Sequence, residues 1–249
     1  MAKKIFNIRY KVLIILLLVS LVPIALMGFI ATQKGQNLLK ESLGLSLRED
    51  ASHLIETIDR ELFIWTLHIK TWSTLSVMQD VLADDPDGRI AELLVNSKRE
   101  YGINLEILCT NNKGKVIAAT KPEVINQDAS EEEWFIKMRQ KPELQSGGYH
   151  FDSLLKREAI EYAYPIFAIF DPTQVIGYLS LHVYFDEFHK MIDSAMVSDK
   201  EQNRFNYILM INNKGEVIAA PRFLREEKGE ALFRENLASL GYKSAREAI

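Results

Sequence analysis

The strongest hydrophobic pattern in the chain is an uninterrupted apolar run near its start. Val12 to Ala31 comprises twenty residues and no charged side chain. A helix needs about 20 apolar residues to cross the hydrocarbon core of a bilayer, and such a helix tolerates a proline like Pro23. We therefore predict a transmembrane helix at residues 12–31 that contacts membrane lipid. A cleaved signal peptide is the alternative, but its apolar core is usually about 7–15 residues long.

Basic residues precede this run and set its expected orientation. The first eleven residues contain no acid and four basic side chains: Lys3, Lys4, Arg9 and Lys11. Positive flanks face the cytoplasm. The pattern predicts a cytoplasmic tail at residues 1–11 and an extracytoplasmic body from residue 32 onward.

A helical period follows over residues 34–83. Apolar residues recur at spacings of three and four, which places them on one helical face: Ile55, Ile58, Leu62, Trp65, Ile69 and Trp72. We predict a long stalk helix over residues 32–86, ended by Pro86 and Gly88. The apolar stripe has two interpretations, a seam between two copies of the chain or a face packed against the chain's own sheet.

Beyond the stalk the pattern changes to short β-rich runs. "ILCTNNKGKVIAA" (107–119) predicts a hairpin with Gly114 in its turn, and three later runs predict strands: "GGYHFDSL", "AIEYAYPIFAIF" and "QVIGYLSLHVYF". "EEEWFIKM" predicts a helix with a capping box of Ser130 and Glu133. "DEFHKMIDSAM" predicts another helix, before the polar linker "VSDKEQNR". This is an α+β layout, a PAS-like antiparallel sheet with helices around it.

The first hairpin recurs 101 residues later. "ILMINNKGEVIAA" (208–220) matches it at ten of thirteen positions, which predicts two tandem domains of one fold, at residues 87–198 and 199–249. The first unit uses residues 120–185 to complete its sheet, whereas 29 residues follow Ala220. We expect the second unit to be incomplete, so that the chain is the N-terminal part of a longer protein. The alternative is completion of the second unit by a partner strand.

Charge and composition exclude several function classes. The formal net charge is -4, and beyond residue 11 there are 26 basic against 34 acidic side chains, so nucleic-acid binding is not expected. The single Cys109 excludes an intrachain disulfide. The chain has no G-x-S-x-G, P-loop or H-E-x-x-H motif, and its five histidines have no metal-ligand spacing. We expect no catalytic residues, no metal and no cofactor, and any output enzyme to lie beyond residue 249.

The ordered set of motifs resembles the double Cache sensor regions of bacterial chemoreceptors, histidine kinases and diguanylate cyclases. The set is "NNKGKVIAAT", "EEEWFIKM", "YAYPIF", "VIGYLSLHV" and a second "NNKGEVIAA". The resemblance implies an inner-membrane anchor and a long helix running along two stacked PAS-like domains. It implies a small-molecule ligand in the first, membrane-distal domain. We also expect a homodimer formed through the long helix. The competing interpretation is a membrane-anchored module that binds another protein and no small ligand.

The resemblance also indicates site residues. Family members that bind amino acids use an Arg two residues before a Trp-aromatic pair, and an Asp late in the sheet. Trp134 and Phe135 match the pair, but Glu132 stands at the Arg position and His182 at the late Asp position. The amino-acid clamp is therefore not reproduced, and Glu132 suits a cation instead of a carboxylate.

Strand alternation supplies the remaining candidates. Tyr149 and Phe151 share one face of their strand, while His150 and Asp152 share the other, and the resemblance favours Asp152. Tyr162 and Tyr164 share a face of the next strand. The predicted ligand-binding residues are Trp134, Phe135, Glu132, Asp152, Tyr149, Tyr162, Tyr164 and His182.

Overall fold

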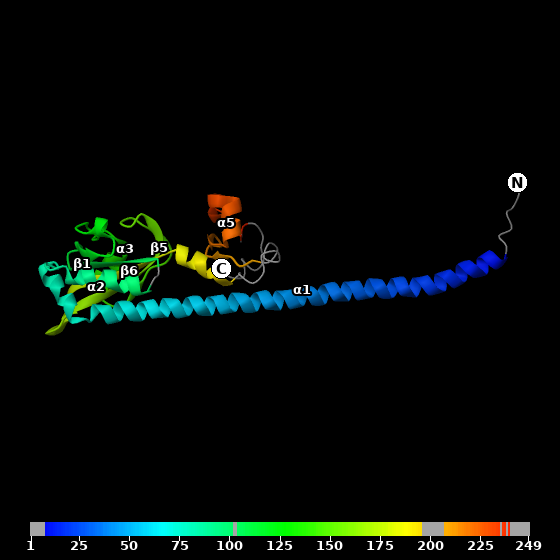
Figure 1. The fold of residues 1–249 in the computed structure, drawn as a ribbon, viewed down its shortest axis with the longest axis horizontal. Coiled ribbons are helices and arrows are strands. Elements are labelled where there is room, and N and C mark those ends of the chain that lie inside the picture. Colours follow the sequence, from blue (N-terminus) through cyan, green and yellow to red (C-terminus); the bar gives the residue numbers. More distant parts are fainter. Residues whose placement is uncertain (1–7, 102–103, 196–206, 235, 238, 240–249) are drawn as a thin grey trace. The chain divides into compact units, whose positions relative to one another are not determined.

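The computed structural model describes residues 8–101, 104–195, 207–234, 236–237 and 239 (Figure 1). The chain divides into two compact units, Met1–Ser52 and His53–Ile249. Helix α1 (Ile8–Ser73) contributes to both units, and each unit is described by itself below.

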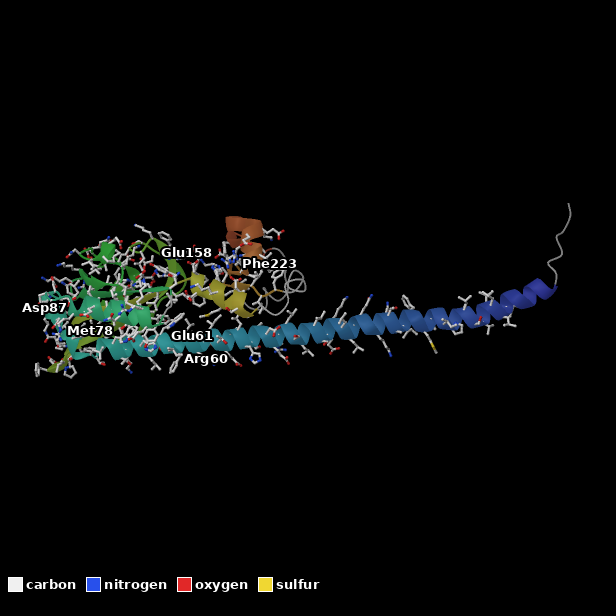
Figure 2. All side chains as sticks on the ribbon, viewed as in Figure 1. Arg60, Glu61, Met78, Asp87, Glu158 and Phe223 are labelled. Carbon is white, nitrogen blue, oxygen red and sulfur yellow. The ribbon has the colours of Figure 1, made fainter. Side chains whose placement is uncertain are left out.

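The described part of the first unit is the N-terminal part of α1. Its large apolar side chains, among them Leu16, Val19 and Met27, are exposed. Figure 2 shows side chains projecting outward on both sides of this part of the helix. The helix contains an 18-residue window with a mean hydropathy of 2.5, none of it buried. Within the described ranges, α1 alone is long and apolar enough to cross a membrane. The membrane span at residues 12–31 stays a prediction.

In the second unit, α1 buries one face against the sheet domain. Ile58, Trp65 and Ile69 are buried and belong to one hydrophobic cluster with strand residues such as Leu181. The apolar stripe therefore packs against the chain's own sheet, which was the second of the two interpretations. Ile55 is 59% exposed and lies outside this face, where Leu54 is buried instead.

α1 ends earlier than the sequence predicts. The helix stops at Ser73, and the 3₁₀ helix η1 (Ser76–Ala83) follows. The N–H groups of Thr74 and Leu75 bond to the carbonyls three residues back, those of Thr71 and Trp72. Bonds to the third residue back belong to a 3₁₀ turn, so the α-helix gives way to η1 at this point.

Helix α2 (Arg89–Tyr101) follows and is not apparent from the sequence pattern, because its apolar stripe is short. Its start is fixed by Asp85, whose two carboxylate oxygens accept the N–H groups of Ile90 and Ala91 at 3.0 and 3.1 Å. A carboxylate at this position satisfies N–H groups that have no partner within the helix.

The sheet confirms the α+β fold and the predicted meander. Its strands pair antiparallel in the order β2-β1-β6-β5-β3, and β4 also pairs with β5. The strands are β1 (Leu105–Asn111), β2 (Val116–Ala119), β3 (Gln145–Ser146), β4 (His150–Asp152), β5 (Arg157–Ala168) and β6 (Asp171–Tyr184). A one-turn 3₁₀ helix, η2 (Pro122–Val124), follows β2.

Both faces of this sheet are covered. On the face we call the α1 face, Tyr162 and Leu181 pack in the cluster that contains Trp65. On the opposite face, the α3 face, Ala163 and Tyr178 pack in a separate cluster with residues of helix α3 (Glu133–Gln140). Figure 1 shows α1 running along one side of the sheet. Because side chains alternate along a strand, β5 and β6 serve both faces.

The predicted capping box of α3 is wrong. The N-cap is Glu132, without a side-chain capping bond, and the Ser130 N–H donates to the Asp128 carboxylate at 2.9 Å. Glu133 pairs with Lys137 instead, at 2.6 Å. The Asp128 turn takes the N–H of Ser130, so the helix begins later than a Ser130 cap requires.

The second hairpin is present as predicted. It follows helix α4 (Asp186–Ala195), which was also predicted, whereas the linker at 197–204 lies outside the described residues. The strands of this hairpin are β7 (Met210–Ile211) and β8 (Val217–Ala219). Helix α5 (Arg222–Lys228) and the 3₁₀ helix η4 (Gly229–Arg234) follow it.

The two hairpin turns use the same hydrogen bonds. Asn111 Oδ1 accepts the N–H groups of Lys113 and Lys115, and Asn212 Oδ1 accepts those of Lys214 and Glu216. The glycines that follow, Gly114 and Gly215, have φ values of 95° and 80°. The repeated "NNKG" is thus a turn motif whose asparagine organises the backbone and whose glycine takes a left-handed conformation.

We predict that Gly114→Ala destabilises the sheet domain by about 1–3 kcal/mol. Its added Cβ would lie 2.8 Å from the Ser130 backbone nitrogen, at a positive φ. Gly148→Ala is the matched control, because nothing lies within 4 Å of its added Cβ. Urea unfolding of the detergent-solubilised chain measures both variants. Equal unfolding midpoints for the two would contradict this account of the turn.

Candidate functional site

Trp134 and Phe135 occupy the first turn of α3 and are buried against β6. The Trp134 ring meets Phe135 edge-to-face, with centroids 5.7 Å apart, and His182 with centroids 6.1 Å apart. Phe135 meets Tyr178 in the same way, at 5.1 Å. Edge-to-face contacts of this kind stabilise aromatic pairs beyond the area they bury. The predicted aromatic pair therefore forms the cover of the α3 face.

Charged and polar side chains lie on this face of the strands. Asp152 of β4, Glu161 of β5, and Ser180 and His182 of β6 are all buried. Glu161 and His182 are direct partners in the β5–β6 register, so their side chains are neighbours. Buried charge is costly unless it is paired, and each of these groups has a close contact.

His182 lies between Asp152 and Ser180. Its Nδ1 is 2.7 Å from Asp152 Oδ2, although the ring N–H is poorly aligned, and its Nε2 is 2.9 Å from Ser180 Oγ. Burial tends to raise the pKa of Asp152. Contact with His182 and a hydrogen bond from the Leu155 N–H lower it, and the net pKa lies below its usual value.

The contacts from Ser180 to His182 and from His182 to Asp152 resemble those of a Ser-His-Asp triad in hydrolases. Ser180 and His182 are both 0% exposed, so the hydroxyl is sealed from any substrate in this conformation. Ser180 Oγ also lies 3.5 Å from the Leu108 carbonyl oxygen. We assign this trio an electrostatic role in the sheet and no catalytic role.

His150 and Glu161 form a second acid–histidine pair. Nε2 of His150 lies 2.6 Å from Glu161 Oε2, and its Nδ1 lies 3.0 Å from the Gly148 carbonyl oxygen. Both ring nitrogens face acceptors, so both must carry protons, and the ring is a cation. Glu161 raises the pKa of His150 to about 9, against the opposing effect of burial.

Three buried atoms on this face lack an aligned hydrogen-bond partner among the residues that the structure describes. They are the Trp134 indole Nε1, His182 Nδ1 and Glu161 Oε2, although the last two lie 2.7 and 2.6 Å from Asp152 and His150. Such atoms are uncommon in folded proteins. Over the described residues, no group of three or more His, Cys, Asp or Glu side chains is arranged to hold a metal ion.

Five of the eight predicted site residues come together at this face. Trp134, Phe135, Asp152 and His182 are in it, and Glu132 borders it by accepting a hydrogen bond from the Ser153 hydroxyl. The resemblance indicated these five residues, and strand alternation alone left open which face Asp152 takes. Whether these residues bind a ligand stays a prediction.

The other three predicted residues lie elsewhere. Tyr162 and Tyr164 belong to the cluster on the α1 face, because Glu161 and Ala163 take the alternate positions toward α3. Tyr149 packs its ring on Phe185 at 4.7 Å. The structure therefore does not bring these three tyrosines together with Trp134, and the site proposed below does not include them.

Glu161, His150 and Ser180 are the residues that sequence reasoning left out. The available signal was an acid inside an otherwise apolar strand, "AIEYAYPIF". A buried acid in a strand interior is unusual enough to indicate a functional position. The two tyrosines that follow it, Tyr162 and Tyr164, drew the prediction to the opposite face of the sheet.

No protein-family model and no curated protein matches the sequence, but the fold has clear counterparts among solved structures. The ligand-binding domain of the Campylobacter jejuni chemoreceptor Tlp3, in complex with 4-methylisoleucine, superimposes with a TM-score of 0.53 at 15% identity. The match covers 72% of this chain and 68% of that one.

Two further structures have the same fold. The sensor domain of the V. cholerae histidine kinase DctB has a TM-score of 0.54 at 12% identity, covering 74% of this chain and 67% of its own. The ligand-binding domain of the Pseudomonas fluorescens chemoreceptor CtaA, in complex with L-serine, has a TM-score of 0.55 at 14% identity. That match covers 81% of this chain and 79% of the CtaA domain. The chain thus has the Cache, PAS-like fold of sensor domains.

We predict that the His150–Glu161 pair makes stability fall with rising pH. The folded pKa of about 9 lies above the unfolded value near 6.5. The pair therefore stabilises fully below pH 6.5, and its contribution is lost as the pH rises through 9. Since His150 is partly exposed, we expect a loss of about 1 kcal/mol after solvent screening. Urea unfolding at several pH values, compared with His150→Gln, measures this. Parallel pH profiles for the two proteins would contradict the assignment.

Proposed function

We propose that this chain is the extracytoplasmic sensing region of a bacterial transmembrane signalling receptor, and that a small molecule binds at the α3 face of its first PAS-like domain. The observation that carries the proposal is the buried acid–histidine cluster beside Trp134. Strongly perturbed, buried ionisable groups concentrate at functional sites. Their occurrence in a sensor fold, on the face covered by the aromatic pair, favours ligand binding over a purely structural role.

The position of the cluster suggests how binding reaches α1. Glu161 and His182 face α3, while their sequence neighbours Tyr162 and Leu181 pack in the cluster that contains Trp65 of α1. A ligand that prefers one arrangement of β5 and β6 would therefore bias the packing of α1. It can do so only through a difference in its affinity for the two arrangements.

The membrane placement belongs to the same proposal. The exposed apolar helix around residues 12–31 would sit in lipid, with the basic residues 1–11 on the cytoplasmic side. The sheet domain would then lie outside the inner membrane. In a complete receptor, an output module would respond to the shift of α1.

A second candidate is an anchored module that recognises another protein and no small molecule. Phe170, in the turn between β5 and β6, is 100% exposed, beside Ile169 at 56%. Exposed apolar residues at a turn are a common feature of protein contacts. The buried charges on the α3 face have no role in this candidate, which is why we place it second.

We predict saturable thermal stabilisation of the full chain, in detergent, by one class of compound in a screen of amino acids, amines, carboxylates and nucleobases. A ligand at 100 times its dissociation constant stabilises by about 2.7 kcal/mol. Trp134→Ala should abolish the shift and Trp134→Phe should reduce it. Phe170→Ala is the matched aromatic control and should leave the shift unchanged. Stabilisation that survives Trp134→Ala would place the ligand elsewhere, and no hit would favour the protein-binding candidate.

We also propose that the long helix pairs with a second copy of the chain. The buried stripe of α1 is used by the sheet, so pairing needs a different face. Ile55, Phe63 and Leu67 of α1 are 59, 62 and 47% exposed. Phe63 and Leu67 are four residues apart and therefore neighbours on the helix surface, and Ile55 lies about two turns before Phe63. A second copy would cover this face with the same residues, as a two-fold interface requires.

Phe63→Glu combined with Leu67→Glu should reduce the cross-linked dimer of the membrane-embedded chain several-fold, because it places charge in an apolar contact. Gln140→Glu introduces a charge at an exposed residue of α3 and serves as the control. Chemical cross-linking in native membranes gives the readout. Undiminished dimer in the double variant would exclude this face from the interface.

A further inference from the structure

We propose that Glu161 is the recognition group for a small organic cation, and that His150 is a built-in cation with which this ligand competes. The inference rests on the proposed function and gives its ligand a chemical class. It begins from the asymmetry between the two acid–histidine pairs on the α3 face. His182 is fully buried, whereas the His150 side chain is 31% exposed over a Glu161 side chain that is 4% exposed.

The two histidines differ in the charge that their contacts require. His182 faces one carboxylate and one hydroxyl, and a neutral ring satisfies both, because a hydroxyl can donate as well as accept. His150 faces a carboxylate and a backbone carbonyl, which both only accept. The buried Glu161 carboxylate is therefore neutralised by the more accessible of the two rings.

The local backbone makes His150 the easier partner to displace. Glu161 lies within the twelve-residue strand β5, whereas His150 begins the three-residue strand β4 after Gly147 and Gly148. The segment lies directly over the acid, since a Cβ on Gly147 would be 2.1 Å from Glu161 Oε1. A short strand next to glycines loses few backbone hydrogen bonds when it moves.

Trp134 places an aromatic ring close to the acid. It is 2% exposed and touches His182, the register partner of Glu161. An indole face near a carboxylate is a favourable environment for a cation. Glu161 Oε2 lies 2.6 Å from His150 Nε2, and a ligand that carries N–H groups can take the place of this ring.

The charge balance selects the sign of the ligand. The charged groups that act on His150 are Glu161 of β5, Asp152 of β4 and Glu133 of α3. A protonated amine that replaces His150 keeps Glu161 neutralised. A carboxylate ligand would add a negative charge beside Asp152 and Glu161, which burial makes expensive. The expected class is a protonated primary amine without a carboxylate.

The test uses matched compounds with the full chain in detergent, measured by titration calorimetry. One set is isobutylamine, L-valine and isovalerate, and a second is phenethylamine, L-phenylalanine and 3-phenylpropionate. In each set the amine, the amino acid and the carboxylate share one carbon skeleton. We expect the amines to bind and the carboxylates not to bind. Glu161→Gln should weaken amine binding at least tenfold, with folding checked by circular dichroism.

His150→Gln is the decisive variant, because it leaves the buried acid in place. Loss of the competing ring should tighten amine binding about fivefold at pH 7. This factor corresponds to the free energy of a partly exposed ion pair. In the wild type, amine affinity should rise by a similar factor as the pH passes through 9, since alkylamines stay protonated there. His150→Gln should lack this rise.

Three results would overturn the proposal: amine binding that is unchanged in Glu161→Gln, amine binding that weakens in His150→Gln, or no binding by any amine. Carboxylate or amino-acid binding that is lost in Trp134→Ala would overturn the cation class and leave the proposed sensing site intact. Absence of binding by every compound of the broader screen would count against both.

Discussion

β5 and β6 must fill two packed faces at once, because α1 covers one side of the sheet and α3 the other. Each strand therefore alternates between two environments along its length. Tyr162, Leu181 and Val183 pack toward α1, while Glu161, Ser180 and His182 point toward α3. This division places the chain's charged cluster on a rigid support and puts an apolar layer directly behind it. A change on one face that moves the strands therefore also affects the other face.

Each acid of the α3 face lies against a histidine. Asp152 contacts His182 and Glu161 contacts His150, at 2.7 and 2.6 Å. Paired buried charges are often no more stable than an apolar core of the same shape, so stability alone is a weak reason for this arrangement. The pairs differ in accessibility and in required protonation, which makes one of them fixed and the other exchangeable. That difference is what turns a buried polar core into a candidate recognition site.

Much of the fold follows from sequence patterns alone. The membrane-length apolar run, the α1 stripe, both hairpins and the meander have periodicities that a reader of the sequence can find. The errors are local: 3₁₀-type backbone bonds at Thr74 and Leu75 end α1 early, and the Asp128 turn displaces the start of α3. Local hydrogen bonds of this kind leave little trace in a hydrophobic pattern.

The site was only partly predictable. The aromatic pair and Asp152 were found, but alternation shows which residues share a face and not which face lies toward α3. That ambiguity put Tyr162 and Tyr164 in the predicted site in place of Glu161.

The central claim is that a small molecule binds on the α3 face and that β5 and β6 carry its effect to α1. The three tryptophans report on it directly, since Trp134 covers the α3 face while Trp65 and Trp72 pack from α1. Indole N–H resonances of the ¹⁵N-labelled chain, titrated with a hit compound, should show the largest shift at Trp134 and a smaller shift at Trp65. Saturable binding that moves only the α1 tryptophans, or none of the three, would contradict the account.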